Sequence, residues 1–224
     1  MKKAILGVFV VVAMLVSGVV SAGHKVNIQK LVEDTQRMEQ SGGKITLVWW
    51  IPDAYWKESF RQAPGMTQAQ KDEFLKMVKD YTIICVMDGK IGNFGGVKTA
   101  SRTEIMKNII LSVDGRKYKP LADSQISGDA KTFLGMMKPV MSNMLGQVGS
   151  GLEFMAFDGK NKKGAPLLNP MKKGAFTVTF LNKDYKWRLP LGSLLPPMQD
   201  PKTKEVFPGN YLYNPYTGKK LIRK

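Results

Sequence analysis

Three Asp-Gly pairs constrain the fold of this chain more than any other feature of its sequence. They are Asp88-Gly89, Asp114-Gly115 and Asp158-Gly159, and each follows an apolar run of the kind that forms strands. Asp-Gly favours the left-handed backbone of tight hairpin turns, so the runs beside such pairs are expected to lie antiparallel. The predicted hairpins join 81–87 with 91–98, 105–113 with 116–121, and 176–181 with 185–189. We therefore expect meanders in the second half of the chain.

Apolar residues at helical spacing precede and separate these strands. This spacing predicts helices over 25–40, 53–62, 67–80 and 129–148. Gly42-Gly43 is expected to end the first helix, Thr67 with Gln70 makes a capping box for the third, and Pro139 must kink the last. A buried strand is expected over 45–51. The chain is thus predicted to be an α+β protein, with an antiparallel β-sheet built from hairpins and meanders, three to four helices and a small ribbon-like tail.

The N-terminus has the three parts of a secretory signal peptide. A positively charged start is followed by an apolar run over 4–16 and by small residues that end in Ala22. We expect cleavage after Ala22, which gives a periplasmic or extracellular protein that begins at Gly23 and has no transmembrane helix. The alternative is an uncleaved anchor, because 4–22 carry no charge. The small residues at the cleavage site favour removal.

Charge is distributed unevenly along the expected mature chain. Residues 23–89 hold 9 Lys and Arg against 9 Asp and Glu, whereas residues 90–224 hold 23 against 9. The predicted organisation is a signal peptide over 1–22, an α+β domain over 23–191 and a ribbon-like tail over 192–224. Within the domain, 23–89 is helix-rich and charge-balanced, and 90–191 is β-rich and basic.

The basic second part indicates an anionic partner. For an exported protein, such partners are an anionic envelope polymer, lipid head groups or an acidic protein. Nucleic acid is not expected, because the chain is exported and shows no recognition motif beyond its charge. The alternative is a solvated surface that keeps the protein soluble. The candidate ligand-binding residues are Lys160, Lys162, Lys163, Lys172 and Lys173.

A second hypothesis is a periplasmic binder of copper or of a small apolar ligand. After cleavage, the terminal amine, the next amide nitrogen and the imidazole of His24 could chelate Cu(II). Met137, Met141 and Met144 follow one another at helical spacing and could offer thioethers to Cu(I) or line an apolar groove. The same spacing is typical of core packing, because methionine fills irregular gaps.

Enzymatic chemistry has little support in the sequence. The single histidine stands near the expected mature terminus, so neither Ser193 nor Cys85 has an imidazole base within the domain. Cys85 lies in an apolar run, which predicts a buried core residue. Glu153 and Asp158 are close in sequence, but their spacing does not predict a converging carboxylate pair. The sequence favours a non-enzymatic module without a cofactor.

The tail over about 198–221 has two similar turns. Asp200-Pro201-Lys202-Thr203 and Asn214-Pro215-Tyr216-Thr217-Gly218 both match the frame of a Cys-Pro-x-Cys-Gly knuckle. The tail therefore resembles a zinc ribbon, in which two such knuckles hold one metal ion. All four ligand positions carry Asp, Thr, Asn and Thr, which do not form the thiolate set that holds structural zinc. The resemblance implies a metal-free remnant that is stabilised by its turns.

Overall fold

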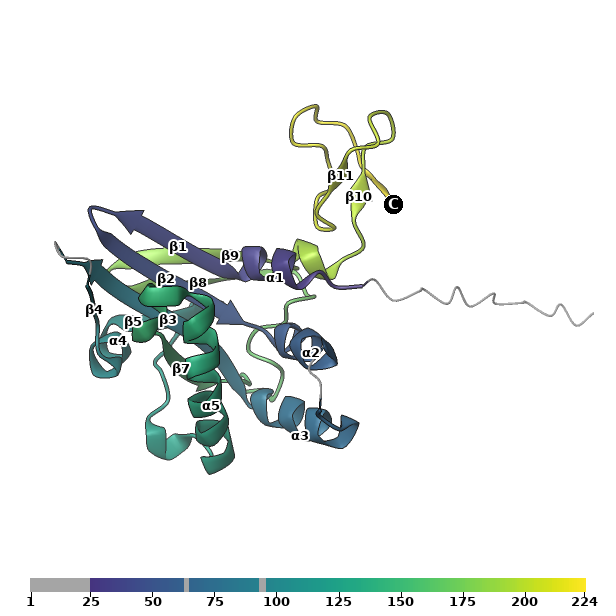
Figure 1. The fold of residues 1–224 in the computed structure, drawn as a ribbon. Helices are drawn as coiled ribbons and strands as arrows, with labels where there is room; N and C mark the ends of the chain where they lie inside the picture. Colours follow the sequence, from purple (N-terminus) through teal and green to yellow (C-terminus); the bar gives the residue numbers. More distant parts are fainter. Residues whose placement is uncertain (1–24, 63–64, 93–95) are drawn as a thin grey trace, which may run out of the picture.

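The computed structural model describes residues 25–62, 65–92 and 96–224. Within these residues it contains five α-helices and three antiparallel sheets, which confirms the predicted α+β class (Figure 1). The predicted signal peptide and His24 lie outside the described residues. No helix in the described part of the chain is both long and apolar enough to cross a membrane.

The main domain contains most of the secondary structure, and the tail adds three short strands. In chain order the elements of the main domain are α1 (Ile28–Thr35), β1 (Gln36–Ser41), β2 (Lys44–Ile51), α2 (Asp53–Gln62), α3 (Gln68–Val78), β3 (Tyr81–Ile91), β4 (Val97–Thr99), α4 (Arg102–Asn108), β5 (Ile109–Val113), β6 (Arg116–Tyr118), α5 (Gly128–Met144), β7 (Glu153–Asp158), β8 (Gly174–Phe180) and β9 (Lys183–Leu189). The tail has β10 (Met198–Gln199), β11 (Val206–Phe207) and β12 (Ile222–Arg223).

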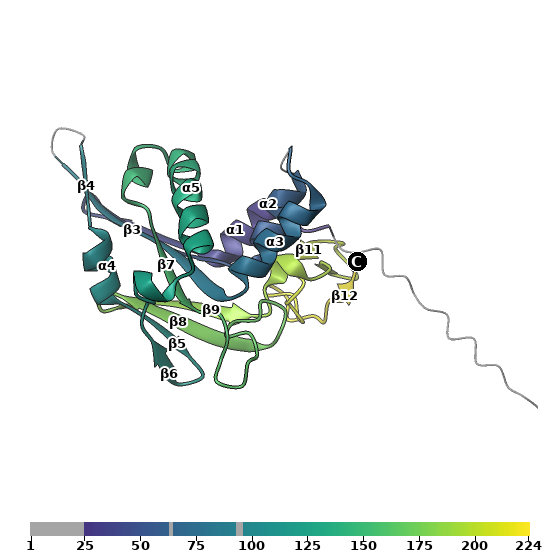
Figure 2. The same ribbon diagram turned by 90° about the horizontal axis from the view of Figure 1, so that it is seen from below.

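The main domain has three layers. The first sheet has the order β1-β2-β3-β4, with β7 also paired to β3, and the second has the order β6-β5-β8-β9. Figure 2 shows α1, α2, α3 and α5 on one side of β3 and β7, and the second sheet on the other. Because both of its faces are covered, β2 is buried from Ile45 to Ile51, whereas β9 alternates between buried and exposed residues.

Tryptophans join the three layers. The Trp49 ring meets Tyr55 of α2 edge-on at 5.2 Å, whereas Trp50 meets Phe176 of β8 at 4.9 Å on the opposite face of β2. Phe176 in turn stacks on Trp187 of β9 at 4.8 Å. Alternation along β2 therefore sends one tryptophan to the helices and the next to the second sheet.

Thr35 ties the end of α1 to both sheets. Its hydroxyl donates to the Leu31 carbonyl and accepts a hydrogen bond from the Trp49 indole at 3.1 Å. Its carbonyl accepts from the Trp187 indole at 3.0 Å. Both indole donors are buried, so these bonds satisfy groups that would otherwise be costly to bury.

The first predicted helix is half the expected length. The chain leaves the helix at Thr35 and continues as β1, which pairs with β2 through a turn at Gly42-Gly43. The prediction of helix through Gln40 was therefore wrong, and Met38, in the part that forms β1, is 52% exposed. The glycine pair forms a hairpin turn instead of ending a helix.

The Asp-Gly pairs occupy different structural positions. Asp114 and Gly115 have φ of 48° and 75° and form the predicted turn between β5 and β6. The hairpin predicted to turn at Asp88-Gly89 is wrong, because β3 continues through this pair to Ile91 and pairs with β4 from Gly89 to Ile91. The predicted pairing of β8 with β9 is confirmed.

Two further predictions need correction. The strand predicted over 105–113 begins only at Ile109, because Ser101 and Glu104 form a capping box that starts α4. The helix predicted over 129–148 is α5, which ends at Met144 and contains Pro139. Phe133 and Met141 face the core, whereas Met144 is 68% exposed.

Candidate functional site

A strand and a loop bring basic side chains together beside the second sheet. Strand β6 supplies Arg116 and Lys117, and the loop between β7 and β8 supplies Lys162 and Lys163. We call these four residues the basic cleft. They line two neighbouring cavities of about 650 and 250 Å³, together with Tyr118 and two aspartates. All four side chains are exposed, and none forms an ion pair within the described residues.

Local hydrogen bonds shape the β7–β8 loop. The Asn161 side chain accepts from the backbone N–H groups of Lys163 at 2.9 Å and Ala165 at 3.2 Å. A bridge joins Lys160 to Pro166, and buried Leu167 anchors the loop to the core. The two exposed lysines at the loop tip are thus carried by a folded turn.

The five lysines predicted to bind a ligand do not lie together in one site. Lys162 and Lys163 belong to the basic cleft, but Lys160 forms an ion pair with Asp80 at 2.8 Å. Lys172 and Lys173 precede β8 and line none of the cavities at the cleft. Sequence reasoning missed Arg116 and Lys117, although they follow the correctly predicted Asp114-Gly115 turn.

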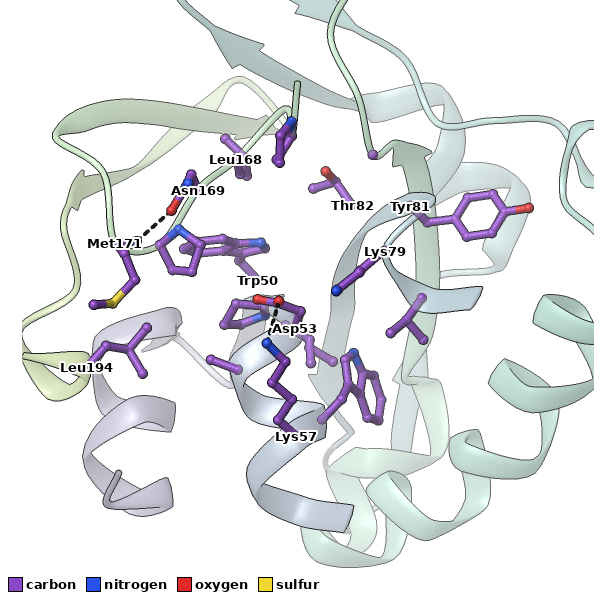
Figure 3. Close-up of a pocket in the computed structure, with 18 of the residues that line it drawn as sticks. Trp50, Asp53, Lys57, Lys79, Tyr81, Thr82, Leu168, Asn169, Met171 and Leu194 are labelled. Carbon is purple, nitrogen blue, oxygen red and sulfur yellow. Dashed lines mark hydrogen bonds and ion pairs between the residues drawn. The ribbon is translucent and has the colours of Figure 1, made fainter. Parts of the chain in front are cut away.

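A third cavity, of about 510 Å³, lies between α2, the start of β3 and the loop that precedes β8 (Figure 3). We call it the tryptophan cavity, because Trp50 and Trp56 contribute to its walls. Its charged lining residues are Asp53, Lys57, Lys79 and Lys160. Its apolar lining residues include Val26, Pro52, Val78, Pro166, Leu168, Pro170, Met171 and Leu194.

The predicted thioether set is divided between the core and the surface. Met141 is 1% exposed and packs in the core, Met137 is half-buried against it, and Met144 is 68% exposed. These three residues therefore do not form one exposed face of α5. Among the described residues, no group of three or more histidine, cysteine, aspartate or glutamate side chains could hold a metal ion.

The sequence candidates for catalysis are held apart or buried. Glu153 and Asp158 are the first and last residues of β7, which places them about 17 Å apart at the usual rise of a strand. Glu153 forms an ion pair with Lys138 at 2.6 Å. Cys85 is fully buried, and burial raises the pKa of its thiol well above the ordinary value. The thiolate needed for nucleophilic chemistry is disfavoured there.

The two turns of the tail have the same hydrogen-bond pattern. The side chain of Asp200 accepts from the N–H groups of Lys202 and Thr203, at 2.8 and 3.1 Å. Asn214 likewise accepts from Tyr216 and Thr217, at 2.9 and 3.3 Å. The fifth residue of each turn, Lys204 or Gly218, has a positive φ and donates its N–H to the carbonyl of the first.

A buried hydrogen bond joins the two turns. The Asn214 amide donates to the second carboxylate oxygen of Asp200 at 2.8 Å, and the two residues are 2% and 1% exposed. The hydrogen bonds from Asn214, Thr203 and Lys202 lower the pKa of the Asp200 carboxyl. Phe207, also buried, lies beside the rings of Tyr211 and Tyr216.

The lowered pKa of Asp200 predicts that the tail loosens in acid. Because the folded pKa lies below the unfolded value of about 3.9, this stabilisation is complete above that value and is lost as the pH falls through the folded pKa. NMR titration of the Lys202 and Thr203 amide signals should give a midpoint below about 3.9. The step should disappear in Asp200→Asn, and a midpoint at or above the unfolded value would contradict the prediction.

Comparison with known proteins gives no relative from which to transfer a function. No family model matches the chain, and neither the curated proteins nor the solved structures give a significant match. The fold and the sites therefore define a class only: an α+β protein with a basic cleft, a tryptophan cavity and a tail built on two similar turns.

Proposed function

We propose that this protein is an exported, non-enzymatic binding module whose basic cleft takes an anionic partner outside the cytoplasm. The observation that carries the proposal is that Arg116 and Lys117 of β6 line two neighbouring cavities together with Lys162 and Lys163 of the β7–β8 loop. Side chains of like charge that converge without counterions raise the local concentration of anions.

Charges around the cleft favour an anionic ligand over a neutral one. The larger cavity also contains Asp158 and Lys160, and Lys160 is balanced by its ion pair with Asp80. The smaller cavity adds Asp114. The four cations of the basic cleft therefore outnumber the two aspartates. An envelope polymer, lipid head groups or an acidic protein would each supply the matching charge, and the predicted signal peptide would bring the protein to them.

Loss of the cleft charges should weaken binding to anionic envelope material. We expect the triple variant Arg116→Gln/Lys162→Gln/Lys163→Gln to co-sediment with isolated envelope fractions much less than the unchanged protein at low salt. Binding of the unchanged protein should also fall as salt is added, because exposed charges are screened.

A charge-matched variant separates a specific cleft from overall basicity. Lys76→Gln/Lys107→Gln/Lys131→Gln removes three exposed positive charges at other places. It should retain most of the binding. Equal losses in the two triple variants, or undiminished binding by the cleft variant, would contradict a role for the basic cleft.

We also propose that the tail is a metal-free relative of a zinc ribbon. Its support is the repeated turn geometry at Asp200 and Asn214 and the hydrogen bond that connects them. In this proposal, the hydrogen bond between the two turns occupies the place where a ribbon holds its metal ion.

A further inference from the structure

The tryptophan cavity is separate in chemistry from the basic cleft. Its volume of about 510 Å³ falls within the range of about 300 to 1,000 Å³ that is typical of small-molecule sites. Its walls come from the end of β2, from α2, from the start of β3 and from the loop before β8, so the cavity forms only when the domain folds. It is therefore a preformed space of ligand size.

The side chains that line the tryptophan cavity are suited to contact the apolar part of a ligand. Trp50 and Trp56 are 3% and 1% exposed, so the indole rings are held in place by the core. Figure 3 shows Trp50 beside Asn169 and Met171, with Leu194 on the α1 side of the cavity. Met171 is 52% exposed, which places this apolar side chain within reach of solvent. Rigid aromatic and aliphatic surfaces of this kind bind apolar groups by removing them from water.

One cation of the cavity lacks a counterion. Lys57 pairs with Asp53 at 3.4 Å, and Lys160 pairs with Asp80 at 2.8 Å. Lys79 lines the same cavity but forms no ion pair with any described residue. It follows the last residue of α3, and Figure 3 shows its side chain pointing into the cavity.

A neutral polar group adds to the charge of Lys79. Thr82 lines the cavity, and its side chain has no hydrogen bond to another described residue. Its hydroxyl can therefore donate to a ligand acceptor in the cavity.

We propose that the tryptophan cavity binds a small monocarboxylate with an apolar body. The carboxylate accepts from the Lys79 ammonium, and the apolar body lies between the tryptophans and the Leu168 and Met171 side chains. A dianion or a polyanion would find only one uncompensated cation here, whereas the basic cleft offers four. The two sites therefore select different ligands.

Decanoate and decanol test this proposal, because they share one apolar chain and differ in charge. Titration of the whole protein, followed by calorimetry and by tryptophan fluorescence, should show saturable binding of one decanoate per chain. Decanol should bind more weakly. Lys79→Gln should weaken decanoate binding about tenfold, the loss expected for one charge-assisted hydrogen bond, and leave decanol unchanged.

Two further variants decide between a specific site and surface adsorption. Lys76→Gln removes an exposed charge from α3, one turn before Lys79, and should leave decanoate binding unchanged. Met171→Trp should fill the cavity and weaken both ligands. Non-saturable binding, equal affinities for the two ligands, or equal losses in Lys76→Gln and Lys79→Gln would each overturn the proposal.

Discussion

Replacing Asp200, Thr203, Asn214 and Thr217 with cysteine is expected to convert the tail into a zinc site. In both turns, two backbone N–H groups point at the first of these side chains, and the residue after the last has a positive φ. The buried Asp200–Asn214 hydrogen bond already brings the first positions of both turns together. Four thiolates in this frame would form the closed tetrahedral set of a structural zinc site.

The four-cysteine variant should depend on metal for an ordered tail. Zinc binding and folding are coupled in small ribbons, and apparent binding energies reach about 10 to 16 kcal/mol in zinc-finger peptides. We expect one zinc per chain under reducing conditions, measured by elemental analysis, and a proteolysis-resistant tail only when zinc is present. Cobalt substitution should give the absorption of a tetrahedral thiolate site.

The control for this experiment keeps the hydrogen bond between the turns. Thr203→Cys/Thr217→Cys leaves Asp200 and Asn214 in place and should bind zinc far more weakly. A four-cysteine variant that takes up no more zinc than this control would show that the two turns do not converge as knuckles do. That result would remove the proposed relationship to zinc ribbons.

Replacing Trp187 with alanine is expected to lower the free energy of unfolding by about 3 to 5 kcal/mol, the usual cost of truncating a large core aromatic. Trp187 is 1% exposed and stacks on Phe176 with planes only 2° apart. Its indole donates to the Thr35 carbonyl, and the Arg37 guanidinium lies 4.9 Å above its ring. Alanine removes all three interactions and leaves a cavity between the second sheet and α1.

Urea unfolding followed by far-ultraviolet circular dichroism would measure this loss. Trp187→Phe keeps an aromatic ring against Phe176 but leaves the Thr35 carbonyl without its donor. We expect that variant to lose about 1 to 3 kcal/mol, the cost of one unpaired buried group. A change below about 1 kcal/mol for alanine would mean that Trp187 does not connect the layers as the contacts indicate.

The positions of the strands were easier to predict from the sequence than the pairing between them. The β5–β6 hairpin was predictable, because Asp114-Gly115 adopts the backbone that its turn requires. Gly89 and Gly159 serve close packing instead. A side chain at Gly89 would come within 3.0 Å of Val97, and one at Gly159 would come within 2.5 Å of the Asp80 backbone. Asp80 lies 79 positions before Gly159 in the sequence, so no local pattern reveals this contact.

The boundary between α1 and β1 shows how tertiary contacts overrode a local pattern. Apolar spacing continued past Thr35, but β1 gains a full antiparallel partner in β2. Thr35 also meets the indoles of Trp49 and Trp187 only if the helix ends there. Conversely, the capping box at Ser101 and Glu104 was visible in the sequence and would have predicted α4.

The candidate sites were less predictable than the fold. Lys162 and Lys163 were among the residues predicted to bind an anionic partner, but Arg116 and Lys117, which line the same two cavities with them, lie more than forty positions earlier in the sequence. Lys160 could not be separated from them without its ion pair to Asp80. The tryptophan cavity has walls from several distant segments, and no spacing rule brings such segments together.

Two hydrogen bonds connect the tail to the main domain. The Ser193 N–H donates to Asp34 of α1 at 2.8 Å, and the Asn210 amide donates to the Pro190 carbonyl at 3.0 Å. Asp34 directly precedes Thr35, whose two tryptophan contacts hold the layers together. The tail is thus connected through the last turn of α1 to the centre of the molecule. Movement of the tail relative to the main domain therefore requires these hydrogen bonds to break.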